Sequence, residues 1–149
     1  MACPYFMPVA KLENGSWQHP ARLPLGCGWS GHCTAPGHEN AIPSQDVLQA
    51  CCNLGYASRC SWAPAERHWD AVRFAVVSPA RSSREDLIPS EIAARLLRLT
   101  VVFERNNRPA GQGELEFDLS TMTWLQHHED ARIQKMAECF LETYLSRRS

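Results

Sequence analysis

The chain has 149 residues, 44% of them hydrophobic, which is the usual size of one domain and enough to bury a core without staples. Its formal net charge of −1 argues against a large basic nucleic-acid surface, although thirteen arginines against two lysines would allow a local basic patch. No apolar run approaches a membrane span, and residues 1–10 lack the positive segment and apolar run of a secretory signal. We therefore expect a cytoplasmic protein without membrane association.

Residues 1–65 are predicted to form a loop-rich module. They contain seven of the ten prolines, six of the eight glycines and three of the five tryptophans, but only six charged side chains. Proline and glycine favour turns, so the backbone can wrap around a ligand without regular strands. Residues 44–50 are the one helical candidate, with Ser44 as N-cap, Asp46 in the first turn and Gly55 just past the end.

Residues 66–149 show conventional patterns. Residues 71–77, 97–105 and 114–119 are predicted strands because apolar and β-branched side chains dominate or alternate in them. The polar segment 106–113 is typical of a turn, which makes the last two strands an antiparallel hairpin. A polar loop at 78–86 and a short helical turn from Ser90 separate the first two strands. On the exposed face, the arginines of the second strand should meet the glutamates of the third: Arg98 and Arg105 with Glu114 and Glu116.

The last predicted element is an amphipathic helix over residues 127–148, with Glu129 and Asp130 in its first turn and Arg147 and Arg148 in its last. It should cover the three-stranded antiparallel sheet. The expected fold class is α+β: a Cys-dense N-terminal module (1–65) and a small antiparallel sheet with a long C-terminal helix (66–149), together one compact unit.

Six of the seven cysteines lie in the first 60 residues. A reducing compartment keeps thiols free, so a Cys-dense stretch there indicates a metal or cluster site before a disulfide framework, and an odd count agrees with this. Cysteine also behaves as a small buried hydrophobe, so several of the six would otherwise pack against Trp17, Trp29 and Trp62. The metal interpretation is favoured because the thiols concentrate where aliphatic residues are scarcest. The six are Cys3, Cys27, Cys33, Cys51, Cys52 and Cys60.

We expect Cys3, Cys33, Cys52 and Cys60 to be the metal ligands, with Cys27 and Cys51 as alternates. Cys3 precedes a proline, a combination that bacterial ferredoxins use at a ligand, and Tyr5 and Phe6 beside it would roof a cluster. Glycines between Cys27 and Cys33 permit close backbone approach. Adjacent thiols usually point in different directions, so only one of Cys51 and Cys52 should be a ligand. Cys51 fits the packed face of the predicted helix, which makes Cys52 the better candidate. Cys139 lies off the apolar stripe of the final helix and is predicted to be a bystander.

The spacing favours an iron-sulfur cluster, with a [4Fe-4S] cluster preferred, over zinc. A zinc finger needs tight thiol pairs, and the chain has no Cys-x-x-Cys. A cluster presents several irons to separate thiolates, which suits widely spaced cysteines. The expected function is electron transfer or a cluster-stabilised accessory subunit, with a redox partner or enzyme subunit as the binding partner. The alternative is a zinc-stabilised interaction or nucleic-acid-binding module.

Two further site types are weaker expectations. A mixed site with His19, His32 or His38 would resemble a Rieske centre, but its Cys-x-His pair is absent. His68, His127 and His128 are predicted to be surface or capping residues. A nucleophilic Cys33 with His32 or His68 as base is conceivable, yet the chain has no phosphate loop, HExxH or GxSxG motif. No catalytic residue is therefore predicted.

Overall fold

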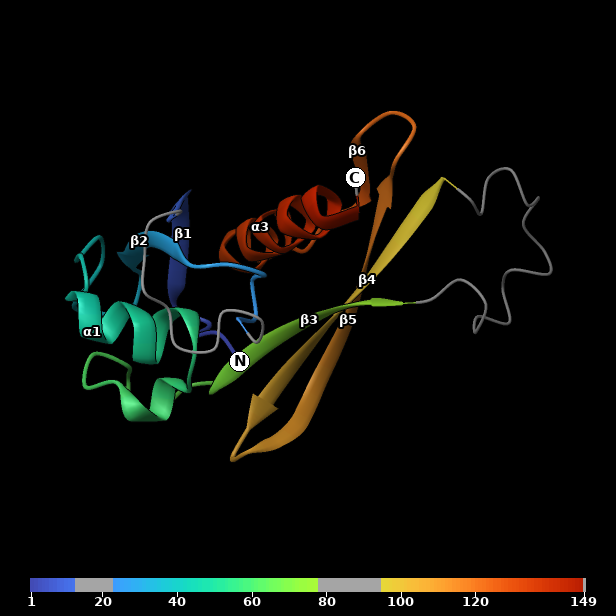
Figure 1. Ribbon diagram of the computed structural model, residues 1–149. Helices are drawn as coiled ribbons and strands as arrows, with labels where there is room; N and C mark the ends of the chain where they lie inside the picture. The colour runs from blue at the N-terminus through green and yellow to red at the C-terminus, as the bar shows by residue number, and fades with distance from the viewer. Residues whose placement is uncertain (13–22, 78–94, 149) are drawn as a thin grey trace.

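The computed structural model describes residues 1–12, 23–77 and 95–148 (Figure 1). It has an α+β fold, as predicted, in which helix α3 lies against the sheets. The predicted loop at 78–86, the turn at Ser90, and Trp17 and His19 lie outside the described residues. The elements are β1 (Phe6–Lys11), β2 (Trp29–Cys33), α1 (Gln45–Val47), the π-helical turn η2 (Leu48–Asn53), the 3₁₀ turn η3 (Ala57–Arg59), β3 (Ala71–Val77), β4 (Leu96–Arg105), β5 (Arg108–Asp118), β6 (Thr123–Gln126) and α3 (Ala131–Arg148).

The larger sheet has the antiparallel order β3-β4-β5-β6. The alternation predicted for the second strand is confirmed, because Leu97, Leu99, Val101 and Phe103 are all buried. Arg98 lies opposite Glu116 and its Nε is 3.5 Å from the carboxylate, which confirms one of the expected cross-strand ion pairs. Three strands were predicted, whereas β6 adds a fourth beside β5.

The β4–β5 turn is tighter than predicted. Arg105 pairs with Arg108, so Asn106 and Asn107 alone form the turn, and residues 108–113 belong to the strand. Both asparagines have positive φ, 54° and 64°, the backbone that a two-residue hairpin turn of type I′ requires and that asparagine tolerates. The polar composition of 106–113 predicted a turn throughout, whereas residues 108–113 form a strand segment whose side chains are largely exposed.

This turn yields a stability prediction. Replacing Asn107 by alanine should lower the free energy of unfolding by about 1 kcal/mol, because a Cβ-bearing side chain without a local hydrogen-bonding group disfavours positive φ. Asn107→Gly is the matched control and should leave stability within about 0.5 kcal/mol of the parent protein. Urea denaturation of the three proteins measures both values. Equal losses in the two variants would contradict the positive-φ turn.

Helix α3 begins later than predicted, at Ala131 instead of residue 127. Asp130 caps it from outside: its Oδ1 accepts from the Arg132 amide at 2.9 Å, and its carbonyl accepts from the Gln134 amide at 2.9 Å. Glu129 therefore lies outside the first turn. His128 precedes the cap, and its Nδ1 accepts from the Asp130 amide at 3.0 Å.

The N-terminal part contains regular strands that its composition did not predict. β1 pairs antiparallel with β2, with a register shift between Pro8 and Ala10. A Cβ on Gly31 of β2 would lie 2.0 Å from the Met7 carbonyl oxygen, so glycine is required for this close pairing. Proline and glycine here mark an irregular two-stranded ribbon instead of a loop.

The predicted helix at 44–50 is present only as the single turn α1. Ser44 is its N-cap and accepts from the Val47 amide at 3.4 Å, as predicted, and Asp46 lies in the first turn. The chain then continues as the π-helical turn η2, which carries Cys51 and Cys52 near its C-terminal end. π-Helical turns are rare and occur frequently at functional sites.

One continuous core joins the two parts of the chain. Ala2, Phe6, Leu25 and Trp29 pack in the same buried cluster as the inner face of the β3–β6 sheet and the buried side of α3. The N-terminus reaches the sheet directly, because Ala2 and Val72 exchange both backbone hydrogen bonds, at 2.8 and 2.9 Å. Figure 1 shows α3 extending from the β3–β6 sheet toward β1 and β2.

Candidate functional site

Five cysteines line one small cavity between β1, β2, η2 and the segment after η3. We call it the cysteine cavity. It contains all four ligands expected from the sequence together with the alternate Cys51. Its remaining walls are aromatic or aliphatic. The lining residues are Cys3, Tyr5, Phe6, Cys33, Ala35, Val47, Cys51, Cys52, Cys60, Trp62 and Ala63.

Backbone hydrogen bonds hold the thiol-bearing segments together. The Cys3 amide donates to the Cys52 carbonyl at 3.1 Å, which links the N-terminal segment to η2. Cys33 ends β2 opposite Phe6 of β1. Cys60 follows η3, and its amide donates to the Ala57 carbonyl at 3.0 Å. Residues up to 57 positions apart in the chain, Cys3 to Cys60, are thus brought to one cavity by main-chain geometry.

The Asn53 side chain joins η2 to β2 through hydrogen bonds. Its side chain is 1% exposed. Its Oδ1 accepts from the Trp29 amide at 2.9 Å, and its Nδ2 donates to the Trp29 carbonyl at 2.9 Å and the Leu48 carbonyl at 3.0 Å. Because η2 carries Cys51 and Cys52 while β2 ends at Cys33, Asn53 joins the two segments that carry these thiols. Sequence analysis missed this residue, although an asparagine next to two cysteines at the end of a helical pattern was the available signal.

A backbone amide is directed at one of the sulfurs. The Ala35 amide donates to Cys33 Sγ at 3.3 Å. A thiolate receives such a bond better than a thiol does, because charge strengthens a hydrogen bond. Amide hydrogen bonds to sulfur are also one of the determinants of the reduction potential of protein-bound clusters.

Burial keeps the Cys3 and Cys52 thiols protonated in the metal-free protein. Burial raises the pKa of the Cys3 thiol to about 12. Burial, followed by the neighbouring Cys3, Cys60 and Cys33 thiols, also raises the pKa of Cys52. Protonated thiols are poor nucleophiles, whereas a metal ion or cluster replaces their protons on binding. The electrostatics of the cavity therefore oppose nucleophilic catalysis by Cys3 or Cys52.

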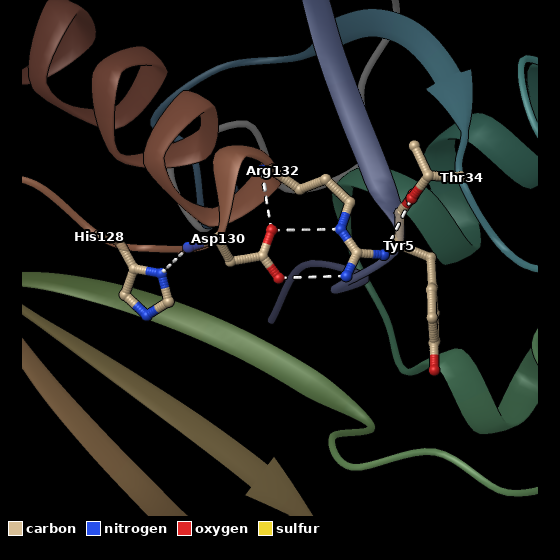
Figure 2. Close-up of polar contacts among 5 residues, drawn as sticks. All are labelled: Tyr5, Thr34, His128, Asp130 and Arg132. Carbon is tan, nitrogen blue, oxygen red and sulfur yellow. Dashed lines mark hydrogen bonds and ion pairs between the residues drawn. The ribbon is translucent and has the colours of Figure 1, made fainter.

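Tyr5, one wall of the cavity, is fixed by the start of α3 (Figure 2). The guanidinium of Arg132 lies over the Tyr5 ring, 5.3 Å from its centroid, and makes a two-pronged ion pair with Asp130 at 3.1 and 3.3 Å. It also donates to Thr34 Oγ1 at 3.0 Å. Thr34 in turn donates from its hydroxyl to the Tyr5 carbonyl at 2.6 Å. Arg132 thus joins α3 to the residue that precedes β1 and to the residue that follows β2.

Cys27 and Cys139 lie elsewhere. Cys27, the other alternate ligand, does not line the cavity; its Sγ is 3.6 Å from Thr143 Oγ1 on α3. Cys139 is 2% exposed, although its place off the apolar stripe had predicted a peripheral position. The reason is that the segment around Gly26 crosses this side of α3, where a Cβ on Gly26 would lie 2.5 Å from the Thr143 side chain.

None of the histidines in the described part of the chain lines the cysteine cavity. His32 and Cys33 are neighbours in β2 and hence point to opposite faces of the ribbon, which opposes their pairing as base and nucleophile. His38 stacks on Trp62 with ring centroids 4.8 Å apart. His68 and His128 line a second cavity, with Trp69 and Phe103, beside the start of α3.

The donor set of the cysteine cavity is sulfur alone, apart from the phenol of Tyr5 and the indole of Trp62. A single metal ion requires its ligands around one point, and in residues 1–12, 23–77 and 95–148 no group of three or more His, Cys, Asp or Glu side chains has such an arrangement. A four-iron cluster has a different requirement, because each thiolate binds a separate iron.

Comparisons with known proteins give no match to this chain among protein-family models, curated proteins or solved structures. Within the described part of the chain, no helix is long and apolar enough to cross a membrane.

Proposed function

We propose that this protein binds an iron-sulfur cluster, of the [4Fe-4S] type, through Cys3, Cys33, Cys52 and Cys60. The observation that carries the proposal is the convergence of five thiols, from four chain segments, on one cavity. The other residues of the cavity wall are aromatic or aliphatic.

The chemistry of the donor set supports the same conclusion. Soft thiolate ligands select zinc, copper(I) and iron-sulfur clusters, whereas magnesium, calcium and manganese prefer oxygen. The apolar walls, including Phe6 and Trp62, would limit access of water to a cluster. Burial and hydrogen bonds to sulfur are the means by which a protein adjusts a cluster's potential, and the Ala35 amide already supplies one such bond.

The proposed role is electron transfer to a protein partner, or service as a cluster-bearing accessory subunit. Cys51, Cys60 and Trp62 are half-buried, whereas Cys3, Cys33 and Cys52 are buried. The cluster would therefore approach the surface on the Cys51 and Cys60 side, where a partner's redox centre can reach it. Reduced thiols require a reducing compartment, which supports a cytoplasmic location.

The test is the composition of the full chain purified without oxygen. The protein should be brown and contain iron and acid-labile sulfide in similar amounts, because sulfide-to-iron charge transfer absorbs visible light in a thiolate-held cluster. Metal analysis of the same sample should find zinc and copper far below iron.

A colourless protein with stoichiometric zinc would overturn the cluster and support the zinc-stabilised module instead. In that case, salt-sensitive binding to nucleic acid becomes the next measurement, since phosphate contacts weaken steeply with salt.

A further inference from the structure

The second cavity, beside the start of α3, is lined mainly by rings, and we call it the aromatic cavity. Its volume is about 200 Å³, smaller than the roughly 300–1,000 Å³ of sites that take drug-sized ligands. Its walls come from the N-terminal segment, the loop before β3, the end of β4 and the first residues of α3. The aromatic lining residues are Tyr5, His68, Trp69, Phe103 and His128.

Trp69 has the largest of these rings, and the sheet holds it in place. The Trp69 ring stacks on Phe103, with the ring centroids 4.9 Å apart. Gly111 lies opposite Phe103 on β5, and a Cβ at Gly111 would lie 2.8 Å from the Trp69 ring. The glycine therefore lets the indole lie close against the sheet. Trp69 is only half-buried, so part of the indole remains accessible from the cavity.

Two imidazole rings flank this pair. The His68 ring is tilted 48° from the Trp69 ring, with the centroids 6.4 Å apart. The His128 ring is tilted 51° from the Phe103 ring, with the centroids 5.8 Å apart. Rings from the loop before β3, from β4 and from the residues before α3 thus border the same space.

The charged groups of the aromatic cavity leave one carboxylate without a counter-charge. The guanidinium of Arg132 uses two nitrogens for the Asp130 carboxylate and the third for Thr34 Oγ1 (Figure 2). Arg132 is therefore engaged within the protein, and its charge is balanced by Asp130. Glu129 also lines the cavity and is exposed. Within the part of the chain that the structure describes, Glu129 makes no ion pair.

An accessible indole beside a free carboxylate suits an organic cation. The ring quadrupole attracts a cation over its face, tryptophan most strongly, and this is how proteins recognise quaternary ammonium groups. We propose that the aromatic cavity binds a quaternary ammonium group over Trp69, with Glu129 as its counter-charge. A primary ammonium is strongly hydrated and fits such walls less well. The inference does not depend on the proposed cluster.

The first experiment titrates the full chain with choline and follows the indole N–H signals of its five tryptophans by proton–nitrogen correlation NMR. The Trp69→Phe variant identifies the Trp69 signal. Choline should shift this signal to saturation. The neutral analogue of choline, in which a tert-butyl group replaces the trimethylammonium group, should bind at least about tenfold more weakly, because it has the same shape without the charge.

Three results would overturn the proposal. The first is equal binding of choline and its neutral analogue, which would show a merely apolar cavity. The second is the absence of a saturable shift with choline. The third is saturation by benzoate in place of choline, which would indicate an anion site at Arg132.

The second experiment tests the counter-charge with two matched variants. Glu129→Gln should raise the Kd for choline about threefold, the effect expected for an exposed ion pair. Glu138→Gln is the control, because Glu138 is an exposed glutamate of α3 that does not line the cavity. Both substitutions change the net charge equally, so only the position of the carboxylate differs. Equal Kd values for the two variants would overturn the role of Glu129.

A third titration identifies the source of the group, since a free small molecule and a methylated lysine side chain both carry it. The probe is N-acetyl-trimethyllysine amide, compared with choline on the same Trp69 signal. Tighter binding of the lysine derivative would assign the cavity to a methylated protein segment, and tighter binding of choline would assign it to a small molecule. Either order supports the site, whereas failure of both probes overturns it.

Discussion

Replacing Asn53 by alanine is expected to lower the free energy of unfolding by about 3–4 kcal/mol. The substitution leaves the buried amide and carbonyl of Trp29 without the Asn53 partner, and each unsatisfied group costs about 1–3 kcal/mol. The three hydrogen bonds that the side chain makes, at 2.9, 2.9 and 3.0 Å, all end with this substitution. Since these bonds join η2 to β2, iron content should fall as well. Urea denaturation and metal analysis measure the two effects.

Asn40→Gly is the matched control. Asn40 is an exposed asparagine in the same part of the chain, with φ of 65°, a backbone that glycine adopts freely, so stability should stay within about 0.5 kcal/mol of the parent. If Asn53→Ala and Asn40→Gly unfold at the same urea concentration, Asn53 does not join the two segments as described.

Removal of the proposed cluster is expected to loosen the cysteine cavity while leaving the sheet and α3 in place. Metal binding energy at such a site is largely folding energy. Without it, the cavity is held by the backbone hydrogen bonds of its segments, such as those of Cys3 and Cys60, and by the Asn53 side chain. The sheet and α3 keep the apolar contacts that they make with each other, among which Leu99 and Met136 are fully buried.

Limited chymotrypsin digestion measures this difference. Chelation under anaerobic conditions should accelerate cleavage at Tyr56 and Trp62 by about tenfold or more, the change expected when local opening becomes easier by about 1.4 kcal/mol. Cleavage at Phe140 and Tyr144 on α3 should remain slow and serves as the internal control. Equal acceleration at all four positions would show that the metal stabilises the whole core as one unit.

The sheet was predictable because its pattern is local. Alternating apolar residues predicted β4, a β-branched run predicted β3 with both ends correct, and the polar segment 106–113 between two strands predicted the hairpin. Its turn was misjudged because exposed strand residues resemble a loop in composition. The start of α3 was misplaced because an acidic residue near a helix start fits two positions, inside the first turn or just before the helix as its cap. Asp130 takes the second position.

The N-terminal part was less predictable because long-range contacts form it. The pairing of β1 with β2 depends on the close approach of Gly31 to the Met7 carbonyl. The hydrogen bonds of the Asn53 side chain with Trp29 join residues 24 positions apart in the chain. Cysteine density pointed to this part of the chain, and the four expected ligands line one cavity. The position of Cys27 against α3 had no local signal, since its partner Thr143 is 116 residues away.

The most direct test of the central claim compares two sets of cysteines in the same assay. One variant replaces Cys3, Cys33 and Cys52 by serine; the other replaces Cys27 and Cys139, which lie outside the cavity. After anaerobic reconstitution, with circular dichroism confirming that both variants are folded, iron and sulfide should be absent from the first and equal to the parent in the second. Iron retained by the variant without Cys3, Cys33 and Cys52, or lost from the variant without Cys27 and Cys139, would contradict a cluster in the cysteine cavity.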